Sequence, residues 1–214
     1  MVFQYEFLCN FFRTSFLYEY SFKKNGLWQV YNIIFYIVQA VIKSLKRLHS
    51  TGYVHWDIKP YNILYKKEYD GSFKFWLIDY GIWTKYVDRE GEHLMQIKRT
   101  KFKGSIEFTS KNWLKKYVPC RKCDLESLIL TMLYLFNGQS IFSREHSNTS
   151  STSRISQQLS KREKLLKRAE SYGMTMYEYA WKDISNSEHI LKFIEEIDKM
   201  EFTQKPNYSL LLKL

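Results

Sequence analysis

Two polar loops, each following a short apolar segment, constrain the fold of this chain more than any other feature. Residues 53–64 begin and end with apolar side chains and hold a carboxylate, an ammonium and a carboxamide between them. Residues 77–81 run from two apolar side chains to a second carboxylate and a glycine. Short apolar segments of this kind predict buried strands. The polar side chains that these strands would deliver are Asp57, Lys59, Asn62 and Asp79.

These side chains, taken in order, fit the needs of phosphoryl transfer. A carboxylate such as Asp57 can orient a hydroxyl and accept its proton, while the ammonium of Lys59 neutralises the moving phosphate. Asn62 and Asp79 supply the oxygen ligands that magnesium prefers. A lone Asp or Asn after a strand is more often a cap or turn residue. Their combination at this spacing favours the chemical interpretation.

The pattern of apolar residues predicts an α+β fold that is mainly α, with small β-hairpins. Apolar side chains recur at helical spacing over residues 28–49, and Gly52 is expected to end that helix in a left-handed conformation. Asp70-Gly71 is a hairpin-turn signal. We expect strands at residues 53–54, 63–65 and 73–78, further helices at 124–136, 161–171 and 187–200, and a last short helix after Pro206.

Two segments carry no clear periodicity. Residues 82–103 contain six basic side chains and are expected to form a basic surface loop. Residues 143–160 are rich in Ser and Thr and predict a flexible insertion.

The net charge of the chain is compatible with several kinds of partner and does not decide among them. The 214 residues carry a formal net charge of +11, which favours acidic or phosphorylated partners. A soluble protein with solvated lysines explains the same charge equally well. Nucleic-acid binding is disfavoured, because the basic residues are spread along the chain and no reader motif is present.

Cysteine and hydropathy patterns suggest an intracellular, cytoplasmic or nuclear, location. Cys9, Cys120 and Cys123 are too few for a disulfide framework. The Cys120-x-x-Cys123 pair invites a metal or redox interpretation, but no second such pair completes a zinc site. The most apolar run, residues 30–42, is shorter than the roughly 20 residues of a membrane-spanning helix. We therefore expect no membrane association, and the aromatic N-terminus lacks the basic start of a signal peptide.

The two loops together resemble those of a known enzyme family. Residues 55–62 follow the pattern H-x-D-x-K-x-x-N and residues 79–81 follow D-[FY]-G, which resemble the catalytic and metal loops of eukaryotic-type protein kinases. Further segments resemble the casein kinase I and vaccinia-related kinase group in particular. These are residues 104–110, residues 121–128, residues 202–210 and Tyr80, which stands where most kinases have Phe.

The resemblance implies a role for each site residue and two cofactors, ATP and Mg²⁺. Asp57 and Lys59 would be catalytic. Lys59, Asn62 and Asp79 would bind the nucleotide with its metal, and Asn62 and Asp79 would be the Mg²⁺ ligands. Asp124, at the start of a central helix, would accept hydrogen bonds from the backbone of the catalytic loop.

Two residues of the first loop modify the expected regulation. Trp56 stands in place of an arginine that in many kinases binds a phosphorylated activation loop, so no such phosphate should be required. His55 is expected to orient the loop and not to act as a base.

The resemblance also implies how the chain is organised. Gly26 is the first glycine, so no glycine-rich phosphate loop precedes the first helix, and no strand lysine of the kinase N-terminal lobe is recognisable. We therefore expect residues 27–214 to form a protein-kinase-like C-terminal lobe, with the N-terminal lobe largely missing. Residues 1–26 would be an aromatic-rich remnant near the hinge.

Two functions follow as alternatives. The first is a truncated serine/threonine protein kinase that transfers the γ-phosphoryl group of ATP to Ser or Thr of protein substrates, which the basic loop suggests are acidic or primed. The second is a catalytically inactive pseudokinase that consists of the C-terminal lobe alone. It would act as a binding or competitor module, with the basic loop at residues 85–103 as its docking surface. The sequence leaves the oligomeric state open.

Overall fold

The computed structural model describes residues 27–98, 105–137 and 188–214, together with isolated positions between 156 and 167. The remnant expected at residues 1–26 lies outside this part of the chain. The insertion expected at residues 143–160 and the helix expected at residues 161–171 also lie outside it, apart from those isolated positions.

A long helix, α3 (Leu27–Ser50), is the central helix of the structure. Its apolar side chains face inward at a spacing of three or four residues, and Ile37, Val41 and Leu45 are buried. The helix ends where Gly52, at φ +83°, donates its backbone N–H to the carbonyl of His49. This left-handed glycine confirms the predicted helix end.

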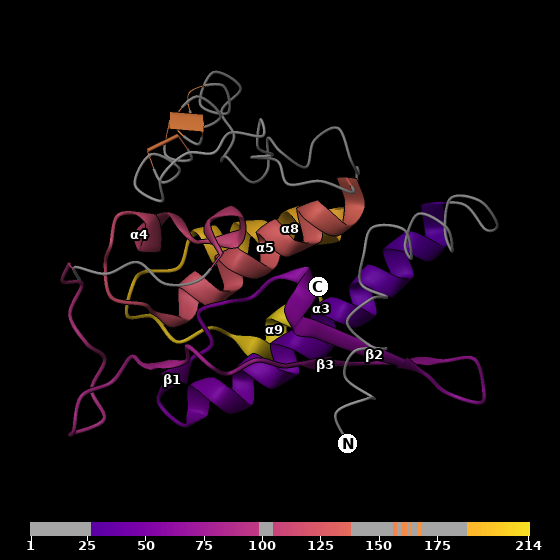
Figure 1. Ribbon diagram of the computed structural model, residues 1–214, viewed down its shortest axis with the longest axis horizontal. Helices are drawn as coiled ribbons and strands as arrows, with labels where there is room; N and C mark the ends of the chain where they lie inside the picture. Colours follow the sequence, from indigo (N-terminus) through magenta and orange to yellow (C-terminus); the bar gives the residue numbers. More distant parts are fainter. Residues whose placement is uncertain are drawn as a thin grey trace.

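Small antiparallel sheets cover one side of α3. β2 (Ile63–Lys67) pairs with β3 (Phe73–Leu77) through a turn that contains Gly71 at φ +83°. The hairpin signal at Asp70-Gly71 is thereby confirmed. β3 packs against α3, which runs from the upper right to the lower left of Figure 1, while β3 lies in its lower part.

A second sheet contains one strand that the sequence pattern did not predict. β1 (Tyr53–Val54) pairs with β4 (Thr84–Lys85) in a two-stranded antiparallel sheet. β4 lies in the segment that we expected to be a loop. A two-residue strand cannot show an alternating pattern, and it is held by pairing with residues thirty positions earlier in the chain.

Helices form the other layer, shown above α3 in Figure 1. α5 (Arg121–Asn137) packs against both α3 and α8 (Glu188–Asp198), and α9 (Tyr208–Leu211) packs against α3. Residues 123–133 of α5 are all buried, including the polar Asp124, Glu126, Ser127 and Thr131, so this helix runs through the interior. Helices and small antiparallel sheets thus make an α+β fold that is mainly α.

The predicted start of α5 was three residues too late. The expected helix began at Asp124, whereas α5 begins at Arg121. The ammonium of Lys122 donates to the carbonyls of Asp198 and Met200 at the end of α8, at 2.7 and 2.8 Å. Such long-range contacts hold polar residues in the first turn of a helix, where an apolar pattern cannot reveal them.

Two short helical turns and α4 (Lys111–Leu114) complete the described elements. The 3₁₀ turns are η2 (Pro60–Asn62) and η3 (Ile106–Phe108). Within the ranges given above, no helix has both the length and the apolar character needed to cross a membrane.

Candidate active site

The β2–β3 hairpin brings the two polar loops to one end of the same small sheet. Ile63, the first residue of β2, pairs with Leu77, the last residue of β3. One step further, the backbone N–H of Ile78 donates to the carbonyl of Asn62 at 2.9 Å. Because the strands are antiparallel, the residue before β2 and the second residue after β3 lie at this same end. Asn62 and Asp79 therefore lie at the same end of the hairpin.

Asp57 is at the centre of the first loop's hydrogen bonds. Its Oδ2 atom accepts a bond of 2.5 Å from the ammonium of Lys59 and one of 3.2 Å from the amide of Asn62. Its Oδ1 atom accepts the backbone N–H of Ser105 at 3.1 Å. The carboxylate is only 9% exposed, so these donors fix its orientation.

Ser105 ties the loop to a segment far along the chain. Besides its backbone bond to Asp57, its hydroxyl oxygen accepts a bond of 3.0 Å from the Lys59 ammonium. Sequence reasoning did not identify Ser105 as a site residue. The available signal was the resemblance of residues 104–110 to a kinase segment, which pointed to the segment but not to this side chain.

The amide orientation of Asn62 leaves its oxygen available as a ligand. The Nδ2 atom donates to the backbone carbonyl of Asp57 at 2.8 Å and to the Asp57 carboxylate at 3.2 Å. With its nitrogen engaged on Asp57, the amide can offer Oδ1 to a hard cation. This donor set fits a divalent metal held by few protein ligands with phosphate oxygens completing the shell.

Asp79 stands on the second loop in a strained conformation. Its φ of +63° is uncommon for a residue other than glycine, and such strain gathers at functional sites. Its Oδ1 atom accepts the backbone N–H of Gly81 at 3.2 Å. A Cβ atom at position 81 would lie 3.1 Å from that oxygen, so glycine suits this place. The side chain is exposed and, in the described part of the chain, makes no hydrogen bond to Asp57, Lys59 or Asn62.

His55 is buried beneath the loop in a structural position. Its Nε2 atom lies 3.0 Å from the carbonyl of Ile78, and its Nδ1 atom lies 3.4 Å from the backbone nitrogen of Asp57. A neutral ring with the proton on Nε2 satisfies both contacts. Burial lowers the pKa of His55 below its ordinary value, against the opposing charge of Asp124. These contacts support the expected role of orienting the loop.

Asp124 holds the loop's backbone from the interior. Its Oδ2 and Oδ1 atoms accept the backbone N–H groups of His55 and Trp56, both at 2.8 Å. The expected acceptance of catalytic-loop hydrogen bonds by this residue is confirmed. The Oδ2 atom also lies 2.9 Å from Nε2 of His49, whose Nδ1 atom lies 2.5 Å from the hydroxyl of Tyr208. Sequence reasoning did not identify His49 or Tyr208, whose link spans 159 positions.

Trp56 faces the interior and not the surface. It is buried, and its ring centroid lies 4.0 Å from that of Trp113. Its backbone φ of +71° is rare for a bulky side chain. The two amides that Asp124 binds flank this residue's strained backbone and can hold it in place.

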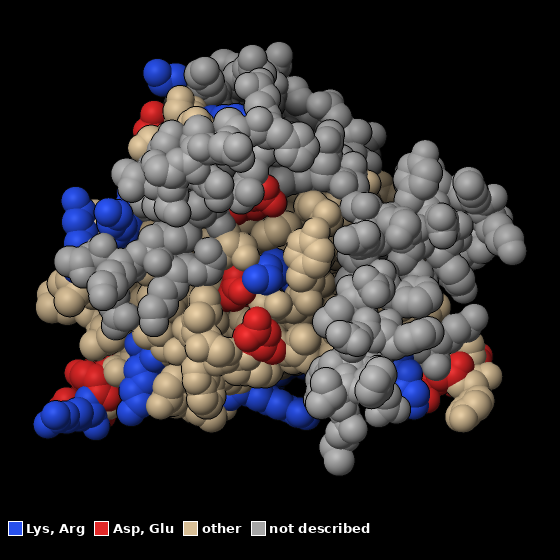
Figure 2. Space-filling model, viewed as in Figure 1, with Lys and Arg blue, Asp and Glu red and all other residues tan. Residues whose placement is uncertain are grey.

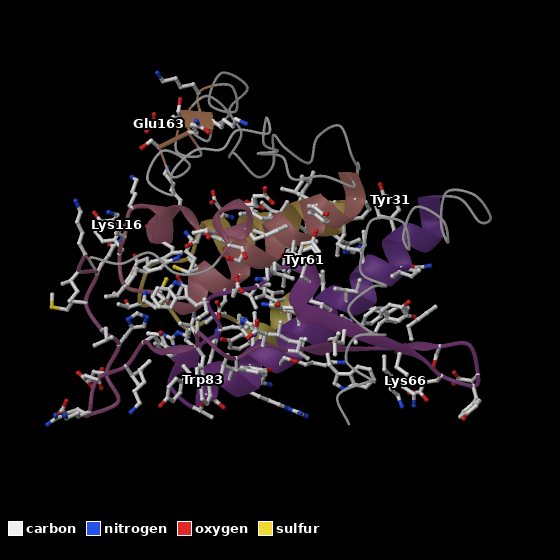
Figure 3. All side chains as sticks on the ribbon, viewed as in Figure 1. Tyr31, Tyr61, Lys66, Trp83, Lys116 and Glu163 are labelled. Carbon is white, nitrogen blue, oxygen red and sulfur yellow. The ribbon has the colours of Figure 1, made fainter. Side chains whose placement is uncertain are left out.

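Charged groups of both signs meet in a hollow near the middle of the face shown in Figure 2. In the same view, Figure 3 shows Tyr61 of η2 near the middle, with Trp83 and Lys66 toward its lower edge. η2 packs against α5.

The Cys120-x-x-Cys123 pair lies apart from this chemistry. Both thiols are buried, with their sulfur atoms 3.2 Å apart, and the hydrogen bond with Cys120, together with burial, raises the pKa of Cys123. The described residues contain no cluster of three His, Cys, Asp or Glu side chains that could hold a metal.

Comparison with known proteins identifies the family. The family model described as "Protein kinase domain" matches residues 10–213. The chain belongs to the protein kinase domain family. Membership implies, in general terms, the use of ATP and a divalent metal ion.

Individual relatives support the expected group. The chain is 25% identical to the "Probable casein kinase I homolog" of Encephalitozoon cuniculi over 82% of its own length and 51% of the relative's. It is 28% identical to the "B1 kinase" of Monkeypox virus, over 78% and 52%. It is also 28% identical to a "Probable serine/threonine-protein kinase" of Fowlpox virus, over 81% and 52%. The resemblance to casein kinase I-like and B1-type kinases is thereby confirmed, and the chain spans about half the length of these relatives.

Proposed function

We propose that this chain carries the catalytic and metal loops of a serine/threonine protein kinase of the casein kinase I and vaccinia-related type. The reaction would transfer the γ-phosphoryl group of ATP to a Ser or Thr hydroxyl of a protein substrate. The observation that carries the proposal is the fixed carboxylate of Asp57. It accepts bonds from the Lys59 ammonium, the Asn62 amide and the Ser105 backbone.

In this proposal, Asp57 orients the substrate hydroxyl and accepts its proton as the new O–P bond forms. Lys59, which lies beside Asp57 and is 20% exposed, contacts the transferred phosphoryl group and balances its charge. Asn62 and Asp79 would hold Mg²⁺, which neutralises charge on the nucleotide phosphates when it is bound. The shared end of the β2–β3 hairpin supports assigning these two residues to one metal site.

The proposed domain organisation follows the same family pattern. Residues 27–214 would correspond to the C-terminal lobe and residues 1–26 would adjoin the hinge, with residues 143–160 as an insertion. A kinase holds ATP between this lobe and an N-terminal lobe that supplies a glycine-rich loop and a lysine. We therefore propose that transfer requires those parts as well, and that the protein to test is the one the cell makes, with its N-terminus determined by mass spectrometry.

Acidic or primed sequences are the proposed substrates. Lys85, Arg89 and Lys98 are exposed on the segment that follows the metal loop. These exposed cations, which alternate with the acidic Asp88, Glu90 and Glu92, can attract phosphorylated or acidic residues of a substrate. Trp56, buried against Trp113, offers no cation to a phosphate on the protein's own loop, which supports activity without such a phosphate.

The decisive experiment is transfer of labelled phosphate from Mg²⁺-ATP to casein and to acidic Ser-containing peptides. Asp57→Asn, Lys59→Met and Asp79→Ala are each expected to lower the rate by roughly a hundredfold or more. Lys66→Met is the matched control, because Lys66 is an exposed lysine on β2 that pairs only loosely with Glu68, at 3.6 Å. Substantial transfer by Asp57→Asn would refute the role of that residue.

A second result would change the function itself. The wild-type protein could show no phosphate transfer and no thermal shift with Mg²⁺-ATP, yet bind the same acidic peptides. That result would refute the proposed kinase activity. Such a result would indicate a binding or competitor module built on the kinase fold.

A further inference from the structure

A groove between α3 and β3 lies apart from the loops discussed above. Its volume is about 380 Å³, and the residues used below line it from the two elements: Tyr36, Lys43 and Arg47 of α3, and Lys74, Phe75 and Trp76 of β3. None of these is a residue of the proposed phosphoryl-transfer site. α3 and β3 are in direct contact in the lower part of Figure 1, so the groove lies between two packed elements.

The groove carries uncompensated positive charge. Lys43 and Arg47 are exposed, and neither has an ion-pair partner among the described residues. Lys74 lies 3.4 Å from a carboxylate oxygen of Glu68, which also pairs with Lys66. One carboxylate shared between two lysines leaves a net positive surface that a negatively charged partner would complement.

Exposed aromatic rings accompany these cations. Tyr36 is 57% exposed and Trp76 is 44% exposed, although large aromatic side chains usually bury most of their surface. Aromatic residues and arginine are enriched at protein-binding surfaces, where the rings act as anchors. The groove therefore offers both a charge preference and apolar contact area.

The third feature is the edge of β3. Consecutive residues Lys74, Phe75 and Trp76 all line the groove, although neighbouring side chains of a strand point to opposite faces. This lining is expected where a strand presents its edge and its backbone to a groove, because the side chain of Phe75 is buried in the core. The sheet contains β2 and β3 alone, so this edge has no strand partner in the described part of the chain. Its backbone N–H and carbonyl groups can pair with an added extended segment.

We propose that this groove is a docking site for an extended acidic segment of a protein partner. The segment adds to the edge of β3, its carboxylates face Lys43, Arg47 and Lys74, and an apolar side chain packs on Trp76 or Tyr36. A single-stranded nucleic acid would also match the charge and the rings. The free strand edge favours a peptide, because only a peptide backbone reproduces the ladder of N–H and carbonyl groups. Docking here does not depend on phosphoryl transfer.

The test is binding of a fluorescent peptide to the full chain, followed by anisotropy. The peptide carries glutamates at alternate positions and one central phenylalanine, so that its carboxylates face one side of a strand. Comparison peptides replace the glutamates with lysines or methylate alternate backbone nitrogens. We expect the acidic peptide to bind, and we expect the lysine and methylated versions to lose binding.

Matched variants locate the site. Lys43→Glu should weaken binding roughly tenfold, because it removes one favourable charge and adds a repulsive one. Lys46→Glu makes the same charge change at another exposed position of α3 that does not line the groove, and it should have little effect. Trp76→Ala should also weaken binding, while circular dichroism confirms that each variant remains folded.

Three results would overturn the proposal. Failure of the acidic peptide to bind at all would rule out the docking site. Equal losses from Lys43→Glu and Lys46→Glu would show attraction to the general charge of the protein. Tighter binding of oligothymidylate than of the peptide, with the same dependence on Lys43 and Trp76, would assign the groove to nucleic acid. Because the assay measures binding alone, each result is independent of the proposed kinase activity.

Discussion

The Nε2 atom of His49 lies 2.9 Å from the Oδ2 atom of Asp124 in the interior of the protein. His49 belongs to α3 and Asp124 to the first turn of α5, so this contact joins the two central helices. The same carboxylate binds the backbone N–H groups of His55 and Trp56. The backbone of the loop that carries Asp57 is therefore positioned by the helical core.

Tyr208→Phe tests how far this support extends. The substitution removes the hydroxyl that contacts Nδ1 of His49 but keeps the ring of α9 in the core. We expect a loss of about 1 kcal/mol in the free energy of unfolding, because a buried acceptor loses its partner. We also expect faster hydrogen exchange at the amides of His55 and Trp56. Chemical denaturation and exchange measured by mass spectrometry check the two effects.

Tyr69→Phe is the control for that experiment. Tyr69 is fully exposed at the β2–β3 turn, so removal of its hydroxyl should change neither quantity. A loss of stability in Tyr208→Phe with unchanged exchange at His55 and Trp56 would contradict the link from α9 to the loop.

A pair of glycines separates backbone strain from steric overlap. Gly52 and Gly71 both have φ of +83°, but a Cβ atom at position 52 would lie 2.7 Å from Cγ2 of Val87, whereas position 71 is open. Gly71→Ala should cost about 1 kcal/mol of stability from the left-handed backbone alone. Gly52→Ala should cost roughly 2–4 kcal/mol, since overlap adds to the strain. Equal losses in urea denaturation would contradict the packing of Val87 on the end of α3.

Two histidines make stability depend on pH. Burial lowers the pKa of His55 and of His93 below the ordinary 6.5, and the nearby Arg121 lowers that of His93 further. Below pH 6.5 the unfolded chain therefore binds protons that the folded protein does not. Stability should be retained above this value and should fall as the pH decreases toward the folded-state pKa values.

Urea denaturation at a series of pH values between about 5 and 7.5 measures this dependence in the range where most carboxylates stay ionised. His93→Gln should make the decline less steep, because it removes one of the two groups. A slope identical to that of the wild-type protein would show that His93 titrates alike in both states.

The parts of the fold that sequence could predict are those encoded over short distances. Helical spacing located α3, the Asp70-Gly71 pair located the hairpin, and motif spacing grouped Asp57, Lys59 and Asn62. Contacts between distant residues left no local trace. Neither the pairing of β4 with β1 nor the bond from Tyr208 to His49 produces a repeating pattern in the sequence. Ser105, 48 positions from Asp57, became visible as a site residue only through its bonds.

Ser105→Ala tests whether that residue positions Lys59. The substitution removes the hydroxyl oxygen that accepts a hydrogen bond of 3.0 Å from the Lys59 ammonium. It keeps the backbone N–H that donates to the Asp57 carboxylate at 3.1 Å. In an active protein, the transfer rate should fall about tenfold, which corresponds to the loss of one charge-assisted hydrogen bond. Ser105→Thr keeps a hydroxyl and should restore most of the rate, whereas Ser209→Ala, at an exposed position of α9, should leave it unchanged.

A second measurement needs no activity: with one restraint removed, Lys59 should react faster with an amine-modifying reagent in Ser105→Ala than in the wild-type protein. Equal modification rates would mean that Asp57 alone orients the ammonium.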